Sequence, residues 1–285
     1  MTVRTPYQRC FCTANGIRQS YLAAGSSDRP AVVLIHGLGW DAERLWSAIV
    51  HDLDEAGWRV IAPDLRGVGQ SAELDQPYTI AHYADDVAAV LDEVGIGRCA
   101  LVGFSMGGMI ATELAGRLPA RAHGLALCCA GLQCTAADAE AVDAMLARAA
   151  ELGPERFAAE QADAIWHRSW AERHPEMVAD FKEWRAAMDQ IALIHAFRAP
   201  FGTDLRPVFA GLDLPIDVVA AADDAFLPPA SARAVAALNA NANLNFIVDC
   251  GHMAPIERPA EFTVALLRLL ARLPVDVRPE PEACA

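Results

Sequence analysis

Short apolar runs alternate along the chain with longer stretches in which apolar residues recur at helical spacing. The apolar runs are rich in Val, Ile and Leu, as strands buried on both faces should be, and they predict strands over 18–24, 31–36, 59–63, 99–104, 123–129, 216–221 and 244–248. The helical spacing predicts helices over 44–55, 80–94, 106–118, 231–238 and 260–273. This alternation is typical of an α/β fold, in which helices flank a mostly parallel sheet.

The alternation breaks between about residues 132 and 211, where helical periodicity continues without a convincing strand. We interpret this stretch as an inserted helical lid of about three helices, over 139–152, 156–173 and 177–197. Trp166, Trp170 and Trp184 supply apolar bulk there, and they either pack the insertion onto the sheet or line a substrate cavity. The predicted organisation is therefore a core in two parts, over 1–131 and 212–273, with a helical lid between them over 132–211. A flexible Pro-rich tail follows over 274–285.

The composition narrows the range of partners. The 285 residues are 54% hydrophobic and 21% charged, which suits a folded domain with a large core. The formal charge of −14, with no Lys or Arg cluster to offset it, argues against nucleic acid and against an anionic membrane surface. A small molecule, and a neutral one, is the partner that fits best. The oligomeric state is left open, with a homodimer among the options.

The sequence carries no targeting or cofactor signal. The first ten residues lack the apolar stretch of a signal peptide, and no run of 18 uninterrupted apolar residues occurs, so we expect a cytoplasmic protein. Of the eight cysteines, Cys99, Cys128 and Cys129 lie in apolar runs, where a thiol acts as a small hydrophobic group. Cys10 and Cys12 have no second Cys or His pair to complete a zinc site, and no GxGxxG follows the first strand. Neither a metal nor a cofactor is expected.

Ser105 stands in the sequence Gly-Phe-Ser-Met-Gly-Gly, between a predicted strand and a predicted helix. A serine at such a sharp turn has its hydroxyl lifted clear of the sheet, and Gly103 and Gly107 are needed because the tight backbone leaves no room for side chains. The helix that starts at Met106 also presents backbone N–H groups to a developing oxyanion. The pattern predicts that Ser105 is a nucleophile and that the Met106 N–H belongs to an oxyanion hole.

A glycine-containing loop follows the strand predicted at 31–36. Main-chain N–H groups in such a loop can point into a site without obstruction, and the Leu38 N–H is the natural second oxyanion donor. We expect Gly37 and Trp40 to contact substrate. His36 sits beside the loop, where fixing the loop by hydrogen bonding is the favoured role over catalysis.

His252 follows the last predicted strand and a glycine, in a loop from which an imidazole could reach Ser105 as general base. Six other histidines lie in helical, strand or insertion patterns without such a setting: His51, His82, His123, His167, His174 and His195. The acid that would orient His252 has two adjacent candidates after the strand at 216–221, Asp223 and Asp224. The segment just after the strand ending at residue 129 contains no carboxylate.

Five landmarks in this order, at 36–40, 64–71, 103–108, 222–228 and 250–252, resemble the α/β-hydrolase superfamily over nearly the whole chain. The resemblance implies an α/β-hydrolase fold and a triad in the order Ser, acid, His. In these enzymes the acid commonly lies four residues before a proline, and Pro228 then selects Asp224. The segments 125–130, 204–206 and 257–263 are most similar to small bacterial esterases and enol-lactone hydrolases, although the His-Gly pair at 36–37 departs from that subgroup.

These features predict a serine hydrolase that cleaves a small carboxylic ester or lactone through an acyl-enzyme, with the triad Ser105, Asp224 and His252. The same residues could serve a C–C bond hydrolase, an amide hydrolase or a cofactor-free perhydrolase. Haloalkane dehalogenases and epoxide hydrolases carry an Asp where this chain has Ser105, which disfavours those reactions. Trp166 and Trp170 are further candidate substrate contacts. From another class, a non-catalytic small-molecule receptor would use the same pocket to hold a ligand.

Overall fold

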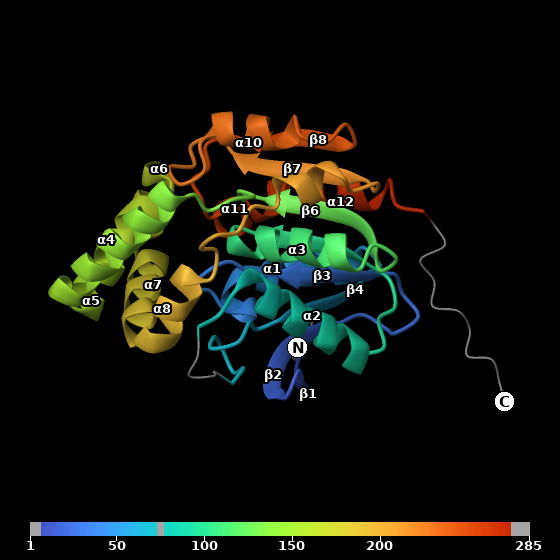
Figure 1. The fold of residues 1–285 in the computed structure, drawn as a ribbon, viewed down its shortest axis with the longest axis horizontal. Helices are drawn as coiled ribbons and strands as arrows, with labels where there is room; N and C mark the ends of the chain where they lie inside the picture. Colours follow the sequence, from blue (N-terminus) through green and yellow to red (C-terminus); the bar gives the residue numbers. More distant parts are fainter. Residues whose placement is uncertain (1–6, 73–76, 275–285) are drawn as a thin grey trace.

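The apolar runs form one sheet whose eight strands have the order β1-β2-β4-β3-β5-β6-β7-β8 in the computed structural model, which describes residues 7–72 and 77–274. Strands β3 to β8 run parallel, whereas β2 is antiparallel to β4 and to β1. The predicted mostly parallel α/β architecture is therefore confirmed (Figure 1). The strands are β1 Gln8–Ala14, β2 Ile17–Ala24, β3 Ala31–Ile35, β4 Arg59–Pro63, β5 Cys99–Phe104, β6 Ala122–Cys128, β7 Ile216–Ala221 and β8 Ala242–Ile247.

Strand β1 is an addition to the seven predicted strands. It forms a hairpin with β2 through Asn15 and Gly16, whose φ angles of 50° and 77° suit a tight two-residue turn. The strand lies at the edge of the sheet and most of its side chains are at least partly exposed. Because an edge strand does not need a continuous apolar run, its sequence carries only a weak strand signal.

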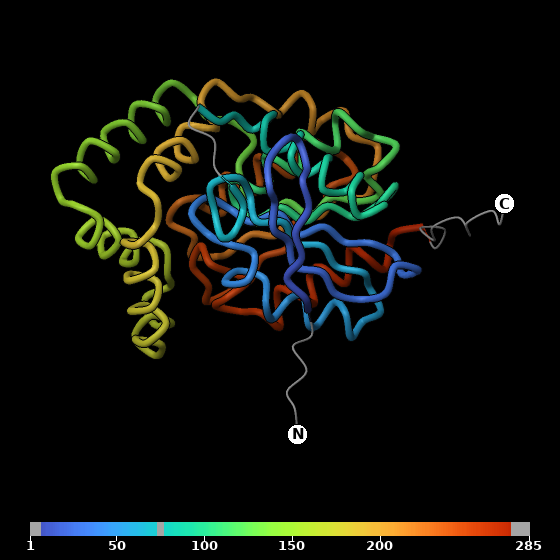
Figure 2. The backbone as a smooth tube through the Cα atoms, turned by 90° about the horizontal axis from the view of Figure 1, so that it is seen from below, coloured from blue at the N-terminus to red at the C-terminus, as the bar shows by residue number. Residues whose placement is uncertain are grey.

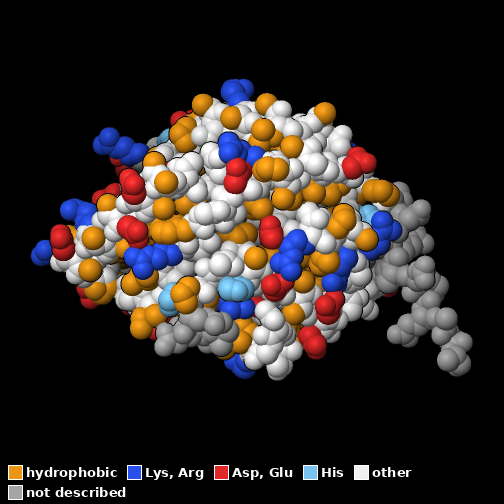
Figure 3. Space-filling model, viewed as in Figure 1, with side chains coloured by type: hydrophobic (Ala, Val, Ile, Leu, Met, Phe, Trp, Pro, Cys, Tyr) orange, Lys and Arg blue, Asp and Glu red, His pale blue; other side chains and the backbone are white. Residues whose placement is uncertain are grey.

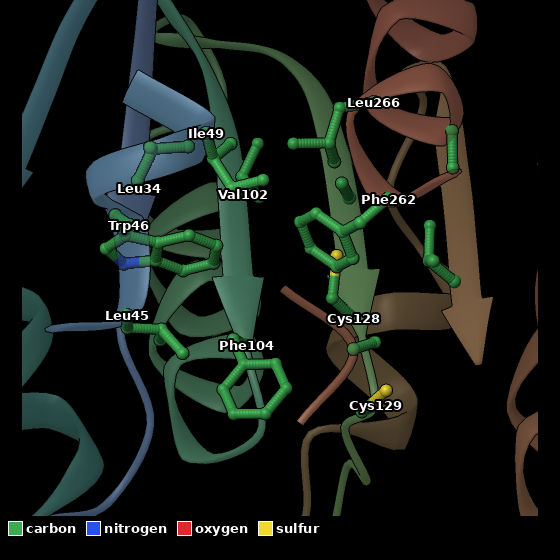
Figure 4. Packing of buried hydrophobic residues seen from close by; sticks show 14 of the residues in the cluster. Leu34, Leu45, Trp46, Ile49, Val102, Phe104, Cys128, Cys129, Phe262 and Leu266 are labelled. Carbon is green, nitrogen blue, oxygen red and sulfur yellow. The ribbon is translucent and has the colours of Figure 1, made fainter. Parts of the chain in front are cut away.

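Alternate residues of the buried strands pack into two hydrophobic layers, one on each face of the sheet. In β3, Val32 and Leu34 belong to the layer under α1 and α12, whereas Val33 and Ile35 belong to the layer under α2 and α3. Figure 4 shows the first layer, where Trp46 packs among strand residues and lies with its ring centroid 6.4 Å from that of Phe104. Burial on both faces explains why these strands are almost entirely apolar. Asp217 in β7 is a buried exception, and it forms an ion pair with Arg272 at 2.6 Å.

Two of the core helices, α1 and α2, begin at residues whose side chains cap them. Asp41 accepts a hydrogen bond from the Arg44 N–H at the start of α1, and Thr79 accepts one from the His82 N–H at the start of α2. The helices of the sheet layers are α1 Ala42–Glu55, α2 Ile80–Glu93, α3 Met106–Arg117, α9 Arg206–Ala210, α10 Pro229–Ala236, α11 Ala254–Glu257 and α12 Pro259–Leu270.

Between β6 and α9 the chain forms five helices, α4 Ala136–Leu152, α5 Pro154–Ile165, α6 Arg168–Arg173, α7 Pro175–Ala187 and α8 Gln190–Arg198. About three were predicted, but extended backbone at Trp166 and Met188 divides two of the expected helices. These five helices lie beside the end of the sheet toward which the arrowheads of β6 and β7 point (Figure 1), and they project from the rest of the molecule when it is viewed from below (Figure 2).

The two stretches of chain that connect this helical segment to the core are hydrogen-bonded to each other. The Cys134 N–H donates to the Thr203 carbonyl at 2.9 Å, and the Leu205 N–H donates to the Leu132 carbonyl at 2.7 Å. Helix α9, which follows, packs against α3, and its Phe209 is fully buried in the core. The helical segment thus begins near residue 132, as predicted, but it ends before the predicted residue 211, because α9 already belongs to the core. The predicted tail from 274 lies outside the described residues, apart from residue 274.

Neither the helices of the described residues nor the surface in view has the features of a membrane-spanning or strongly basic protein. In residues 7–72 and 77–274, no helix is both long and apolar enough to cross a membrane. On the face shown in Figure 3, Lys and Arg side chains are interspersed with Asp and Glu side chains rather than gathered into a basic patch.

Asp64, at the end of β4, joins several elements of the sheet edge. Its buried carboxylate accepts hydrogen bonds from the Ala42 N–H at 2.8 Å, from Arg9 at 2.6 Å and from the Ser20 hydroxyl. Two donors come from the β1–β2 hairpin and the third from the first turn of α1. The aspartate therefore fixes the hairpin and the start of α1, which follows the glycine loop, against the sheet.

We expect Asp64→Asn to lower the free energy of unfolding by about 3 kcal/mol, because the buried carboxylate is lost as the charged acceptor of the partly buried Arg9 and of the Ala42 N–H. Urea denaturation followed by circular dichroism measures this change. The matched control is Asp54→Asn, which breaks the more exposed pair with Arg29 and should cost under about 1 kcal/mol. Equal effects of the two substitutions would contradict the role given to Asp64.

Candidate active site

Ser105 occupies the turn between β5 and α3 in a strained backbone conformation, with φ 54° and ψ −123°. The turn is held by hydrogen bonds from the Ser105 N–H to the Cys128 carbonyl and from the Gly108 N–H to the Ser105 carbonyl. A side chain at Gly103 would collide with the Gly107 carbonyl, and one at Gly107 would collide with the Ile35 carbonyl. Glycine at both positions is what allows the helix to approach the strands and lift the serine hydroxyl out of the sheet.

His252 connects Ser105 to Asp224. Its Nε2 lies 3.2 Å from the Ser105 Oγ, and its Nδ1 lies 2.8 Å from an Asp224 carboxylate oxygen. The imidazole is 10% exposed, and Phe104 and Phe226 flank it with ring centroids 5.1 Å and 5.2 Å away. The structure thus brings together three side chains from the loops after β5, β7 and β8, in an arrangement suited to withdrawing a proton from a serine.

The two candidate acids have different surroundings. The second Asp224 oxygen accepts hydrogen bonds from the Phe226 N–H at 2.8 Å and the Leu227 N–H at 2.9 Å, which aims the buried carboxylate at His252. The Asp223 side chain is 51% exposed and lies 3.8 Å from His167 instead. Of the two residues that the sequence offered, the structure therefore places Asp224 against the imidazole.

The loop after β3 approaches the serine closely. A Cβ on Gly37 would lie 3.0 Å from both the Phe104 carbonyl oxygen and the Ser105 Cβ, so a larger residue would push this loop away from the serine. Leu38 and Trp40 line the cavity beside Ser105. The Met106 N–H lies in the first turn of α3, where amides have no acceptor within the helix. These are the positions from which the predicted oxyanion donors, Leu38 and Met106, would act.

His36 holds this loop rather than facing the cavity. It is fully buried, its Nε2 accepts a hydrogen bond from the Leu65 N–H at 2.9 Å, and its Nδ1 therefore carries the proton and donates to the Gly37 carbonyl at 2.8 Å. Burial lowers the pKa of His36, which keeps it neutral. These contacts agree with the loop-fixing role favoured for His36.

Glu257, in α11, ties the loop of His252 to the helical segment α4–α8. Its buried carboxylate accepts hydrogen bonds from the N–H groups of Gly251 at 2.9 Å, Met253 at 3.2 Å and His167 at 3.2 Å. The His252 N–H also donates to the Ile165 carbonyl at 3.0 Å. Burial raises the pKa of Glu257, although the three N–H groups oppose that shift. The backbone on both sides of His252 is fixed through this carboxylate.

A cavity of ≈ 190 Å³ opens beside Ser105 and His252. The core contributes one part of its wall, and helices α5, α7 and α8 contribute the other through Gln161, Ile165, Phe181, Arg185 and Phe197. Most of the lining is apolar, and its polar groups are few and convergent, as is usual for small-molecule sites. The described residues contain no group of three or more His, Cys, Asp or Glu side chains that could hold a metal ion.

The structure places Trp166 and Trp170 away from this cavity. Trp166 lines a second cavity of ≈ 260 Å³, which shares Trp40 and Phe181 with the first but does not reach Ser105. Trp170 stacks on Trp166 with ring centroids 4.6 Å apart. The two indoles were expected to contact substrate, but they do not line the cavity that contains Ser105. Instead they form an aromatic cluster with Trp40 that packs the helical segment onto the core.

Sequence reasoning missed Gln161, Arg185 and Glu257. Gln161 and Arg185 lie in helices without a motif, and polar residues at helical spacing are usually solvated, so no local signal marks them. Glu257 lies in a segment that resembled related enzymes only as scaffold. The Pro255–Pro259 spacing indicates a short helix at best, and it gives no sign that the carboxylate is buried.

Comparisons with known proteins identify the family to which this chain belongs. The family described as alpha/beta hydrolase fold matches residues 30–259. A protein named "Putative carbamate hydrolase RutD" from Variovorax paradoxus is 36% identical over 89% of this chain and 96% of its own length. The 3-oxoadipate enol-lactonase 2 of Acinetobacter baylyi is 26% identical over 91% of this chain and 96% of its own.

Two solved structures are similar throughout. The enol-lactonase from Burkholderia xenovorans superposes with a TM-score of 0.85 and 28% identity, covering 92% of this chain and 100% of its own. A thermophilic esterase from Thermogutta terrifontis gives a TM-score of 0.84 and 27% identity over 95% and 100%. The chain belongs to the alpha/beta hydrolase fold family, and its relatives named as hydrolases support hydrolase activity.

We expect Glu257→Ala to lower the free energy of unfolding by about 2–4 kcal/mol, because three backbone N–H groups lose their buried acceptor. Thermal and urea denaturation test this expectation. Glu261→Ala is the control, because Glu261 is exposed in the first turn of α12 and its loss should cost less than about 1 kcal/mol. A Glu257 variant as stable as the control would show that the carboxylate does not hold the loop.

Proposed function

We propose that the protein is a serine hydrolase that cleaves small carboxylic esters or lactones through an acyl-enzyme. The observation that carries this proposal is the chain of contacts from Ser105 Oγ through His252 to Asp224, at 3.2 Å and 2.8 Å, in the wall of a small and mostly apolar cavity. A cavity of ≈ 190 Å³ suits an acyl group of few atoms. The names of the relatives, which include an enol-lactonase and an esterase, support the same bond class.

The proposed reaction uses these residues in sequence. His252 Nε2 takes the Ser105 proton as Oγ attacks the substrate carbonyl, and Asp224 stabilises the imidazolium that forms. The Leu38 and Met106 N–H groups would hold the developing oxyanion. The leaving alkoxide departs with the proton from His252. Water, deprotonated by the same imidazole, then attacks the acyl-enzyme carbonyl. The bond to Ser105 Oγ breaks, the imidazolium returns its proton to Oγ, and the acid is released.

Carbamate hydrolysis is a second candidate, favoured by the 36% identical relative from Variovorax paradoxus whose name refers to that activity. A carbamate presents a carbonyl to Ser105 in the same way as an ester does, and the site's residues would act on it in the same order. A screen of neutral and acidic esters, lactones, carbamates and amides, read as kcat/KM, separates the two candidates.

We further propose that helices α4–α8 act as a cap that determines substrate size. Five side chains from α5, α7 and α8 complete the wall of the cavity, and the backbone of α5 and of the turn after it bonds to the His252 loop. A cap that both closes the cavity and contacts the loop of the general base is well placed to select among acyl groups.

Ser105→Ala should reduce ester turnover at least about 10³-fold, because the nucleophile is lost. The protein should remain folded, since Gly103, Gly107 and main-chain hydrogen bonds hold the turn. Turnover of a 4-nitrophenyl ester measures the loss, and circular dichroism checks the fold. A folded variant that retained most of its activity would remove Ser105 from the mechanism.

The two adjacent aspartates form a matched pair. Asp224→Asn should lower turnover roughly 10²-fold to 10⁴-fold, because the imidazolium loses its charged partner and the wrong tautomer of His252 is favoured. Asp223→Asn should cost less than about tenfold, since its carboxylate is half exposed and does not reach His252. Both are measured as kcat under identical conditions, and the reverse order would assign the acid to Asp223.

A further inference from the structure

Arg185 is a buried cation in the wall of the cavity that contains Ser105. It lies on α7, is 5% exposed and lines the cavity together with Gln161 from α5. The remaining cavity residues are mainly aromatic or aliphatic. The guanidinium of Arg185 is suited to binding an anionic ligand, because its planar fork of N–H donors matches a carboxylate.

The contacts of Arg185 are with neutral groups. Its Nε donates to the Gln161 Oε1 at 2.7 Å, and its Nη1 donates to the Gly39 carbonyl at 3.1 Å and approaches the Met188 Sδ at 3.6 Å. Within residues 7–72 and 77–274, no carboxylate lies within ion-pair distance of it, and no protein acceptor is bound to its Nη2. The donors of Nη2 are thus left for a ligand.

The other deeply buried arginine of the described chain, Arg66, has a carboxylate partner. The guanidinium of Arg66 forms two hydrogen bonds with the Asp86 carboxylate, at 2.5 Å and 2.6 Å. Burying a cation without a counter-charge costs several kcal/mol even after relaxation. Consistent with that cost, burial lowers the pKa of Arg185 to about 9. An arginine kept in an apolar cavity at this cost is expected where a ligand supplies the missing negative charge.

The backbone beneath Arg185 is shaped to receive it. A Cβ on Gly39 would overlap the Arg185 guanidinium, so this glycine, with φ 66°, leaves the space that the cation fills. Gly37, two residues earlier, contacts Ser105. Arg185 and Ser105 both line the same cavity of ≈ 190 Å³, so one small molecule can contact the guanidinium and the serine together.

We propose that Arg185 binds a carboxylate on the acyl group of the substrate, so that the preferred substrates are half-esters or lactones of short dicarboxylic acids. This inference rests on the proposed function and narrows its substrate class. It reverses the neutral substrate expected from the net charge of −14, because surface charges are screened within about 8 Å in physiological salt whereas a buried guanidinium in a small cavity is not.

A purely structural role for Arg185 is the competing explanation. The hydrogen bond to the Gly39 carbonyl would then serve only to fix α7 on the loop after β3. Loss of such an anchor would lower activity on all substrates by a similar factor. Loss of a carboxylate-binding group would lower activity on anionic substrates selectively, so the ratio of two matched substrates separates the two roles.

The substrates for the test are the 4-nitrophenyl ester of glutaric acid, which carries a free carboxylate, and the 4-nitrophenyl ester of glutaramic acid, its neutral isostere. The wild-type protein should prefer the acid by about 10-fold to 100-fold in kcat/KM, as a charge-assisted hydrogen bond requires. Arg185→Met should bring this ratio to about one, and Arg185→Lys should retain part of it. The control is Arg168→Met on the neighbouring α6, where the side chain is 92% exposed, and the ratio should not change.

A binding measurement separates failure of this inference from failure of the proposed function. Calorimetric titration of the Ser105→Ala variant with glutarate and with glutaramate should show tighter binding of glutarate, lost on adding Arg185→Met. Glutarate binding without ester turnover would uphold the anion site and reject the ester hydrolase. Ester turnover with no acid preference and no selective binding of glutarate, or an equal loss on both esters in Arg185→Met, would overturn the role of Arg185.

Discussion

The backbone of Ser105 is held in a left-handed conformation at the end of β5, and the rest of the site is arranged around that strained turn. Such a conformation costs about 1–3 kcal/mol and persists only where its surroundings over-determine it. Here the surroundings are the Cys128 carbonyl of β6, the close packing of Gly107 against β3 and the first turn of α3. Because the same contacts raise the hydroxyl above the sheet edge, the strain and the exposure of the hydroxyl have one origin.

The parallel sheet brings the other groups to the same edge. The loops after β3, β7 and β8 all leave from the carboxyl ends of their strands, where ligands of open α/β sheets bind. Two of these loops are fixed by a buried polar side chain, the first by His36 and the last by Glu257 of α11. In the loop after β7, N–H groups of the loop itself orient Asp224. Glu257 also bonds to the turn after α5, so the general base and the helical segment over the cavity share a support.

The sequence predicted most of the sheet because strands buried on both faces are continuous apolar runs, and it missed β1 because an edge strand is not. The turn at Ser105 and the loop of His252 could be found from glycines that punctuate strand ends. Choosing Asp224 over Asp223 needed the resemblance to a family, since two adjacent carboxylates have the same composition signal. Trp170 and Arg185 lie in helices, and Trp166 lies directly after one. Their orientation is set by tertiary packing, so periodicity alone could not show which of them faces the cavity.

The central claim is that Ser105 carries the acyl group of the substrate between two chemical steps, and intact-protein mass spectrometry after acid quenching tests it directly. When the protein is mixed with a 4-nitrophenyl ester and quenched within milliseconds, its mass should rise by that of one acyl group, and the group should map to the peptide that contains Ser105. A Ser105→Ala sample treated in the same way should show no such increase. Two results would contradict the nucleophilic role of Ser105. One is steady turnover with no covalent species, even with a substrate whose acyl group is hydrolysed slowly. The other is an acyl group that maps to another residue.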